Sequence, residues 1–242
     1  MSFVSPSEII PNLHFDSFAI MAPAQVALPA ALPATPSPKT KAQQSVQETR
    51  LSFDESSIQT VDALIRHRAR SNPHATIVAY PSSGVEFVHY SMQQLDVFAY
   101  RTARYYQTWI PTRNSSLIKP TTVALLGPSN LNYLVSMLAL TKLGHTVLFL
   151  STRISQMAVE SLIEITGAIH LIADASFLRF GESVKQNISH LEIHEIASQS
   201  VYDFPVEVHA DTRMDYQLDS SVESLNNIYI IHSSGTLPSD DS

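Results

Sequence analysis

Three short apolar runs in the middle of the chain constrain its fold more than any other feature. They are "TVALLG" (Thr122–Gly127), "HTVLFL" (His145–Leu150) and "AIHLIAD" (Ala168–Asp174). None alternates apolar with polar residues, which is typical of strands buried on both faces of a parallel sheet. Two helical patterns separate the runs: "NLNYLVSMLALTKLG", and residues 156–166 with Ser155 as the N-cap. The order predicts a βαβαβ unit with right-handed crossovers, and therefore an α/β fold with a mainly parallel sheet.

The flanking segments predict further elements. "SIQTVDALIRHRARSNP" has a helical period with Thr60 as its N-cap, and "ATIVAY" and "VEFVHY" on either side of "PSSG" are typical of a hairpin. Ser91 and Gln94 have the spacing of a capping box at the start of the next helix. After the central unit we expect a helix near 177–187, a strand at "LEIHEIA" and a last strand at "NIYII".

The N-terminal part of the chain has a different character. Residues 22–50 are dominated by Pro, Ala, Ser and Gln without a sustained helical or strand period. Such a segment buries too little surface to offset its ordering entropy. We therefore expect residues 1–50 to be a disordered or poorly ordered tail and residues 51–242 to form the folded domain.

Composition excludes several classes of function. Hydrophobic residues make up 44% of the chain and charged residues 15%, as in soluble globular proteins. Acidic residues outnumber basic ones by 22 to 15 without a basic cluster, so nucleic acid is not expected as a partner. The lack of cysteine excludes disulfides, thiolate catalysis and cysteine metal sites. The sequence has neither a run of roughly 18 apolar residues nor a signal-peptide pattern, so we expect no membrane partner and a cytoplasmic location.

The sequence "HSSGT" (His232–Thr236), after the last predicted strand, is a candidate anion-binding loop. Ser233, Ser234 and Thr236 supply hydroxyl donors, and Gly235 lets the backbone turn so that successive N–H groups converge on an anion. A parallel strand would hold the loop at the carboxyl edge of the sheet, where α/β proteins bind ligands. From these five residues alone, a solvated Ser/Gly turn is the favoured interpretation. The patterns of a Walker loop and of a nucleophile elbow are missing.

A resemblance to a known family favours the first interpretation. "IIHSSGT", together with the upstream block "VALLGPSNLNYLVSMLALTKLGHTVLFLSTRIS", resembles the adenylate-forming superfamily of acyl- and aryl-CoA synthetases, luciferases and nonribosomal peptide synthetase adenylation domains. The closest likeness is to the N-terminal part of fungal synthetase-like carboxylic acid reductases. It covers about residues 52–236, and the middle block is its more specific part. The resemblance implies that residues 51–242 form part of the large N-terminal domain of the adenylate-forming fold.

The resemblance also implies roles for a few residues. Ser233–Thr236 match the start of the loop that holds the ATP phosphates, and His232 matches the residue before it. The family continues Thr-Gly-x-Pro-Lys, whereas this chain reads "LPSDDS". Asp240 and Asp241 add negative charge where a triphosphate would lie, and each would oppose binding by about 1 kcal/mol or more at close range. No catalytic residue and no metal ligand of this chain is assigned in this way.

The chemistry implied by the resemblance is the activation of a small carboxylic acid with ATP and Mg²⁺, sometimes with a carrier-protein domain downstream. In the family the acyl pocket, the nucleotide contacts, the magnesium ligand and the lid domain all follow the phosphate loop. We therefore expect this chain to be the N-terminal fragment of a larger enzyme, cut inside that loop and inactive alone. The alternative is a non-catalytic, adenylation-like module that acts as an interaction or decoy protein.

Two further groups of residues have a chemical and a structural interpretation. His190 and His194 are spaced i, i+4 and would share one face of a helix as metal ligands. Because "HLEIHEI" alternates apolar with polar residues, we instead expect both on the exposed face of a strand. Tyr105, Tyr106 and Trp109 are expected to pack in the interior rather than to stack on nucleic-acid bases.

Two other features are expected to be structural. Gly127 lies at a strand-to-helix turn, but a lone glycine is not a dinucleotide fingerprint, so a tight turn is predicted. Glu160 and Glu164 are expected on the solvent face of their helix, with Ile163 and Ile165 pointing inward.

Overall fold

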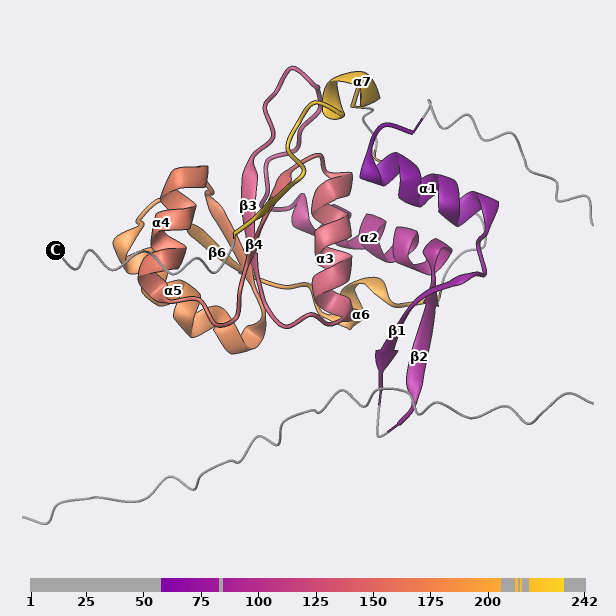
Figure 1. Ribbon diagram of the computed structural model, residues 1–242, viewed down its shortest axis with the longest axis horizontal. Helices are drawn as coiled ribbons and strands as arrows, with labels where there is room; N and C mark the ends of the chain where they lie inside the picture. Colours follow the sequence, from indigo (N-terminus) through magenta and orange to yellow (C-terminus); the bar gives the residue numbers. More distant parts are fainter. Residues whose placement is uncertain (1–57, 83–84, 206–211, 213, 215–217, 233–242) are drawn as a thin grey trace, which may run out of the picture. The chain divides into compact units, whose positions relative to one another are not determined.

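The computed structural model of the chain describes residues 58–82, 85–205, 212, 214 and 218–232 (Figure 1). The predicted tail at residues 1–50 and the loop residues Ser233–Thr236 lie outside this range. The domain boundaries therefore stay predictions.

The helices and strands alternate along most of the chain, as the apolar runs predicted. In order they are α1 (Val61–Ser71), β1 (Thr76–Pro81), β2 (Phe87–Ser91), α2 (Met92–Tyr106), β3 (Thr122–Leu126), α3 (Leu131–Lys142), β4 (Thr146–Leu150), α4 (Gln156–Thr166), β5 (His170–Ala173), the 3₁₀ turn η2 (Ala175–Phe177), α5 (Leu178–Asn187), β6 (Glu192–Glu195), α6 (Gln199–Tyr202), α7 (Ser220–Glu223) and β7 (Tyr229–Ile231).

The central sheet is parallel throughout, with the strand order β6-β5-β3-β4-β7. Strand β3 is its middle strand, and Val123 lies between Val147 of β4 and His170 of β5. All four residues of β5 are buried, and only the first residue of β3 is partly exposed. The predicted α/β class with parallel βαβ crossovers is confirmed.

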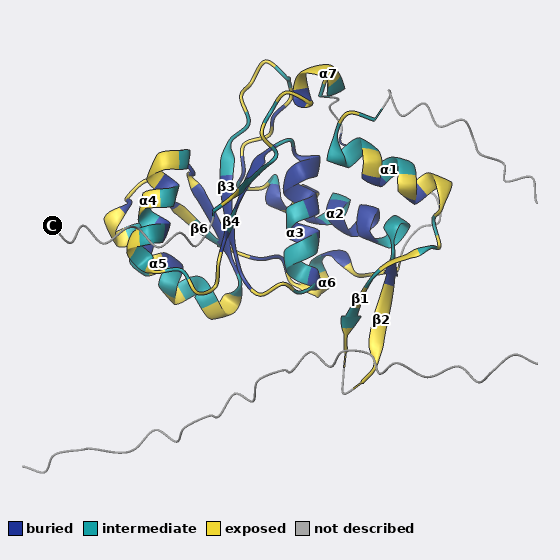
Figure 2. Cartoon of the chain, viewed as in Figure 1, coloured by how far each residue is buried: buried dark blue, intermediate teal, exposed yellow. Residues whose placement is uncertain are grey.

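Helices cover both faces of the sheet because its middle strands are apolar on both sides (Figure 2). Val123 and Leu125 of β3 pack with residues of α2 and α3. Ala124 and Leu126, which point the other way, pack with residues of α4 and α5. This two-fold alternation along a single strand is the geometric consequence of the pleat.

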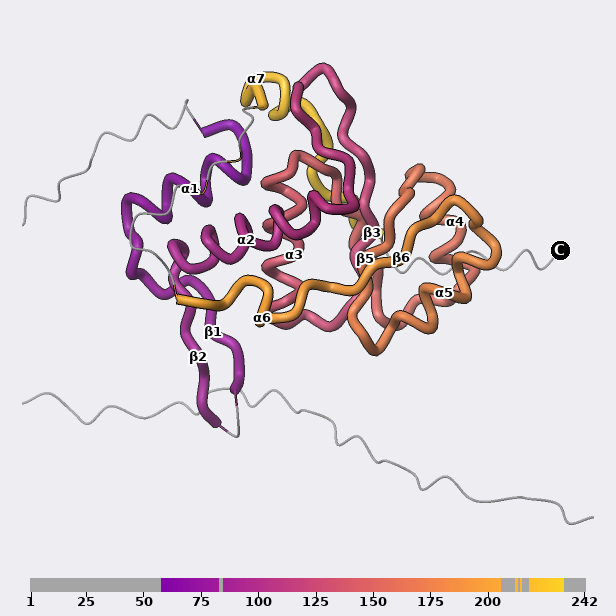
Figure 3. Tube along the Cα trace, turned by 180° about the vertical axis from the view of Figure 1, so that it is seen from behind, coloured from indigo at the N-terminus to yellow at the C-terminus, as the bar shows by residue number. Residues whose placement is uncertain are grey.

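The first part of the described chain adds a hairpin and two helices beside this sheet. Strands β1 and β2 pair antiparallel, which confirms the predicted hairpin. Ser91 caps α2 by accepting a hydrogen bond from the Gln94 N–H, and the Gln94 side chain accepts one from the Ser91 N–H, which confirms the capping box. Figure 3 shows the chain running on from β6 to α6, where Arg101 of α2 donates to the Tyr202 carbonyl at 2.9 Å.

One predicted orientation is wrong. Ile163 is fully buried, but the side chain of Ile165 is 79% exposed. Residues two positions apart in an α-helix lie on nearly opposite faces, so Ile163 and Ile165 cannot both point inward. Glu164 is exposed as expected, whereas Glu160 is partly buried and accepts hydrogen bonds from Gln156 and Asn187 at 2.8 Å.

Within the described ranges no helix has the length and apolar character needed to cross a membrane.

Candidate functional site

The carboxyl edge of the parallel sheet is where the predicted anion-binding loop begins. The residues that directly follow β3, β4, β5 and β7 are Gly127, Ser151, Asp174 and His232. The Ser151 N–H donates a hydrogen bond to Nε2 of His232 at 3.3 Å. His232 is therefore held against the start of the β4–α4 connection, next to the strand that precedes Ser233–Thr236.

Asp174, at the carboxyl end of β5, forms hydrogen bonds with a nearby serine. Oδ1 of Asp174 accepts from the N–H and the hydroxyl of Ser176, at 3.0 and 2.6 Å. Gly127 lies in the turn between β3 and α3, as predicted, and a Cβ there would come within 3.0 Å of the Asp174 Cβ. Oδ1 of Asp174 thus caps the 3₁₀ turn η2 that follows β5.

A cavity of about 230 Å³ lies at the opposite, amino edge of the sheet. Gly144 and His145, just before β4, and Ile228, just before β7, line it together with charged residues of α1 and α3. The predicted loop is at the other end of β7, so this cavity does not belong to the same site.

The charged groups around the cavity are paired inside the protein. Nζ of Lys142 donates to Asp62 at 2.7 Å, to Asp96 at 2.8 Å and to the Thr212 carbonyl at 3.3 Å. The Thr212 hydroxyl donates to the second oxygen of Asp96 at 2.5 Å. Since each of these charges is already compensated, the network is best explained as a support that holds α1, α2 and α3 together.

A second buried ion pair lies beside the same cavity. The Arg113 guanidinium donates twice to Glu223, at 2.7 and 2.9 Å, and also to the carbonyls of Ile118 and Gly144, at 2.8 and 2.6 Å. Burial by itself raises the pKa of the Glu223 carboxyl, but hydrogen bonds from Arg113 and Ser116 outweigh this effect and the pKa is lowered. Glu223 is therefore ionised in the folded protein and, through Arg113, holds α7 against the segments that precede β3 and β4.

His145 directly precedes β4 and follows Gly144, whose carbonyl accepts from Arg113. Its side chain is almost fully buried. Burial lowers the pKa of His145 to about 4, and the positive charge of Arg113 and any charge on His170 act in the same direction. His145 is thus neutral in the folded protein at physiological pH.

Because of His145, the protein is expected to become less stable as the pH is lowered. The unfolded chain takes up a proton near pH 6.5, whereas the folded protein resists it down to pH about 4. The stabilising contribution is fully present above pH 6.5 and is lost as the pH falls, by about 2 kcal/mol at pH 5 and about 3 kcal/mol at pH 4. Urea unfolding of the wild type and of His145→Gln at pH 7.5 and 5.0, with EDTA present, measures the difference. Equal losses in the two proteins would contradict the prediction.

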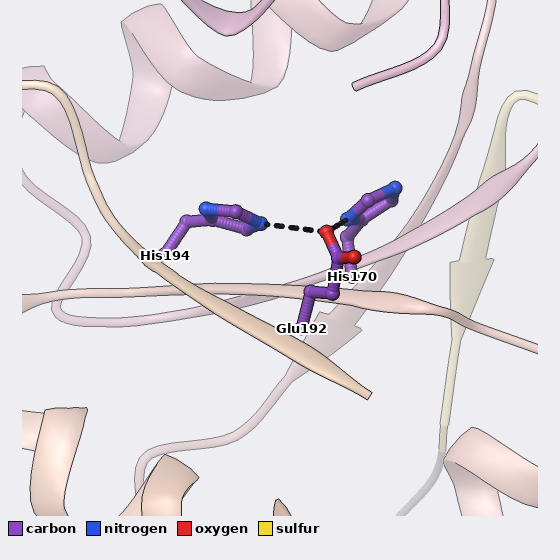
Figure 4. Close-up of side chains that lie close together, drawn as sticks. All are labelled: His170, Glu192 and His194. Atoms are coloured by element: carbon purple, nitrogen blue, oxygen red, sulfur yellow. Dashed lines mark ion pairs between the residues drawn. The ribbon is translucent and has the colours of Figure 1, made fainter. Parts of the chain in front are cut away.

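A cluster of His170, Glu192 and His194 lies at the amino ends of β5 and β6 (Figure 4). Oε2 of Glu192 is 3.3 Å from Nδ1 of His170 and 3.5 Å from Nε2 of His194. Burial lowers the pKa of both histidines, and Glu192 partly opposes that effect. The ring of Trp109 stacks on that of His194 with a centroid distance of 3.6 Å.

This cluster corrects the predicted position of the histidines. His190 lies in the turn before β6, and His194 is a partly buried residue of β6 that is covered by Trp109, so the two do not share an exposed strand face. His170 was missed by the sequence analysis. It lies opposite Glu192 in the parallel register, and only the pairing of β5 with β6 brings the two together. The usable sequence signal was Glu192-x-His194, since residues two apart in a strand share a face.

The aromatic residues at the end of α2 pack as predicted, with one exception. Tyr106 is fully buried, and its hydroxyl shares a hydrogen bond of 2.7 Å with Ser136. Burial raises the pKa of Tyr106 to about 12, so the phenol stays neutral. Trp109 packs between Tyr106 and His194. Tyr105 is the exception, because 43% of it is exposed.

Comparisons with known proteins agree with the resemblance found in the sequence. The chain is 26% identical over 188 residues to the "non-canonical non-ribosomal peptide synthetase ascB" of Acremonium egyptiacum. The aligned region covers 75% of this chain and 17% of that protein. An inhibitor-bound crystal structure of the N-terminal domain of FACL13 from Mycobacterium tuberculosis matches with a TM-score of 0.54 and 18% identity, over 74% of this chain and 42% of the other. A second crystal form of that domain gives a TM-score of 0.51. No profile of a known protein family matches the chain.

The predicted resemblance to adenylate-forming enzymes is therefore confirmed, and for the solved structures it is a likeness of fold. The chain spans less than half of the FACL13 domain and about one sixth of the synthetase. The finer likeness to carboxylic acid reductases stays a prediction.

Proposed function

We propose that this chain is part of an enzyme that uses ATP to convert a small carboxylic acid into an acyl-adenylate. The fold shared with the FACL13 domain, together with the sequence similarity to a peptide synthetase, carries the proposal. In it, residues 51–242 are part of an adenylation domain and residues 1–50 are an N-terminal tail. A cytoplasmic location, a carrier-protein domain and a reductase-like architecture are further parts of the proposal.

The proposed phosphate site begins at the carboxyl edge of the sheet. Strand β7 pairs with β4 in parallel, so both strands end at that edge. His232, fixed by the Ser151 N–H, is the last described residue before Ser233–Thr236. In this proposal the hydroxyls of Ser233, Ser234 and Thr236 and the backbone N–H groups around Gly235 donate to phosphate oxygens of ATP.

The proposed reaction is an adenylyl transfer, a substitution at the α-phosphorus of ATP. A carboxylate oxygen attacks the α-phosphorus, the bond between that phosphorus and the bridging oxygen breaks, and pyrophosphate leaves with the electron pair. Donors fixed around the phosphates stabilise the charge that develops on them. Mg²⁺ would arrive as the counter-ion of ATP. We assign it no ligand in this chain.

Exchange of labelled pyrophosphate into ATP tests the proposal. The protein encoded by the full-length transcript is expected to show exchange that depends on an added carboxylic acid from an aliphatic and aromatic panel. In that protein Ser234→Ala and Thr236→Val should lower the exchange rate on the order of tenfold or more, because each removes a donor to developing charge. Ser224→Ala, an exposed residue just after α7 at the opposite, amino edge of the sheet, is the control and should leave the rate unchanged.

One result would count against the proposal, and another would count against the expected inactivity of this chain alone. Absence of acid-dependent exchange by the full-length protein would reject adenylation. Exchange by residues 1–242 alone would show instead that the expected inactivity of this chain is wrong.

A second candidate function is that of an interaction module, and the edge of the sheet favours it. Among the described residues, β7 pairs with β4 alone, and 78% of Ile231 is exposed. A strand edge of this kind is a template for pairing with another chain. Light scattering during gel filtration of residues 1–242 distinguishes the candidates: a monomer that unfolds cooperatively would reject the interaction module.

A further inference from the structure

We propose that His170, Glu192 and His194 form a binding site for a divalent transition-metal ion, with zinc as the expected occupant. The three residues offer two imidazole nitrogens and one carboxylate oxygen from two neighbouring parallel strands. This donor set suits zinc, and three protein ligands leave a fourth position for water. The site is at the amino end of β5 and β6, so it does not depend on the proposed function.

Register explains why the three side chains meet. His170 is the first residue of β5 and pairs with Glu192, the first residue of β6. His194 comes two residues after Glu192 and therefore points to the same face of the sheet. Each position is fixed by the backbone pairing of the strands rather than by a loop.

The spacing of the donor atoms fits one shared ion. Two ligands about 2.0–2.1 Å from a tetrahedral zinc ion lie about 3.3–3.4 Å apart. The Glu192 oxygen is 3.3 Å from His170 Nδ1 and 3.5 Å from His194 Nε2. All three ligand atoms lie within 4.8 Å of one another, so a modest approach of the two imidazoles completes the geometry.

Three of the four imidazole nitrogens of the cluster make no hydrogen bond to a described residue, and Glu192 approaches two of them only as an ion-pair contact, at 3.3 and 3.5 Å. His170 is 3% exposed, and both its ring nitrogens lack a hydrogen-bond partner among the described residues. Nε2 of His194 is also buried without such a partner. A buried polar atom that makes no hydrogen bond costs stability, and coordination would remove that cost for the one nitrogen of each ring that binds the ion.

The cluster is open to solvent on one side and covered by Trp109 on the other. The Glu192 side chain is 59% exposed, against 20% for His194 and 4% for His170, so an ion enters from the Glu192 side. On the other side the Trp109 ring lies at an angle of 12° to the His194 ring and fixes its orientation.

Titration of zinc into the metal-free chain tests the site, with calorimetry for stoichiometry and tryptophan fluorescence for location. Trp109 is the single tryptophan of the sequence and stacks on His194, so binding should change its emission. We expect one ion per chain, a higher melting temperature with zinc, and affinity lowered at least about tenfold in Glu192→Gln and in His194→Gln. Exposed Glu192 gives the safer variant, since its replacement leaves the buried residues in place.

His190→Gln is the matched control, because His190 is four residues before His194 but outside the cluster. It should bind zinc like the wild type, and circular dichroism should show that every variant is folded. Absence of stoichiometric binding overturns the proposal. So does binding that survives in Glu192→Gln and His194→Gln, or that disappears in His190→Gln.

Discussion

Arg113→Met is expected to lower the free energy of unfolding by about 3–5 kcal/mol, because it leaves the Glu223 carboxylate buried without its partner. Arg113 is 1% exposed and Glu223 is 9% exposed. The guanidinium also donates to the carbonyls of Ile118 and Gly144, so these acceptors lose their partner as well. Urea denaturation at pH 7 measures the change.

A matched arginine provides the control. Arg66 pairs with Asp62 at 2.8 Å, but 25% of the Arg66 side chain and 21% of that of Asp62 are exposed. Arg66→Met should cost no more than about 1 kcal/mol, because this ion pair keeps contact with water and Asp62 retains Lys142 as a second partner. The double variant Arg113→Met/Glu223→Leu should recover part of the loss, since it removes the uncompensated charge. A loss for Arg113→Met as small as that for Arg66→Met would contradict the explanation.

Gly144→Ala is expected to destabilise the protein by about 3 kcal/mol, from a strained backbone and a steric clash together. Gly144 has a φ of 74°, in the left-handed region that L-residues rarely adopt. A Cβ there would overlap Cδ1 of Leu218 and come within 2.7 Å of Nη1 of Arg113. The second of these atoms belongs to the buried ion pair and cannot move without breaking it.

Gly167 separates the two contributions. It ends α4 with a φ of 66°, but a Cβ there would meet nothing within 4 Å. Gly167→Ala should therefore cost about 1–2 kcal/mol from the backbone alone. Thermal and urea unfolding of both variants measure the difference, and equal costs would mean that the clash at Gly144 is relieved by a small movement.

The order of the central elements could be predicted from the sequence because short-range patterns determine it. Continuous apolar runs as short as these, bounded by turn residues, indicate strands covered on both faces, and helical periods between them predict the crossovers. The caps at Thr60, Ser91 and Ser155 could be predicted for a similar reason, since each involves residues three positions apart. Ile165 was placed wrongly because the prediction relied on its apolar side chain and neglected the rotation of about 100° per residue around the helix axis.

The candidate sites depend on contacts between residues far apart in the chain, which local sequence patterns do not predict. The sequence by itself determined the α/β class, the hairpin and the position of the HSSGT segment directly after a strand. Only the tertiary structure decided that His170 faces Glu192 and that Arg113 reaches Glu223, 110 positions away in the chain. The physical reason is that side-chain periodicity fixes which face a residue occupies, whereas strand order and register fix which residues share that face.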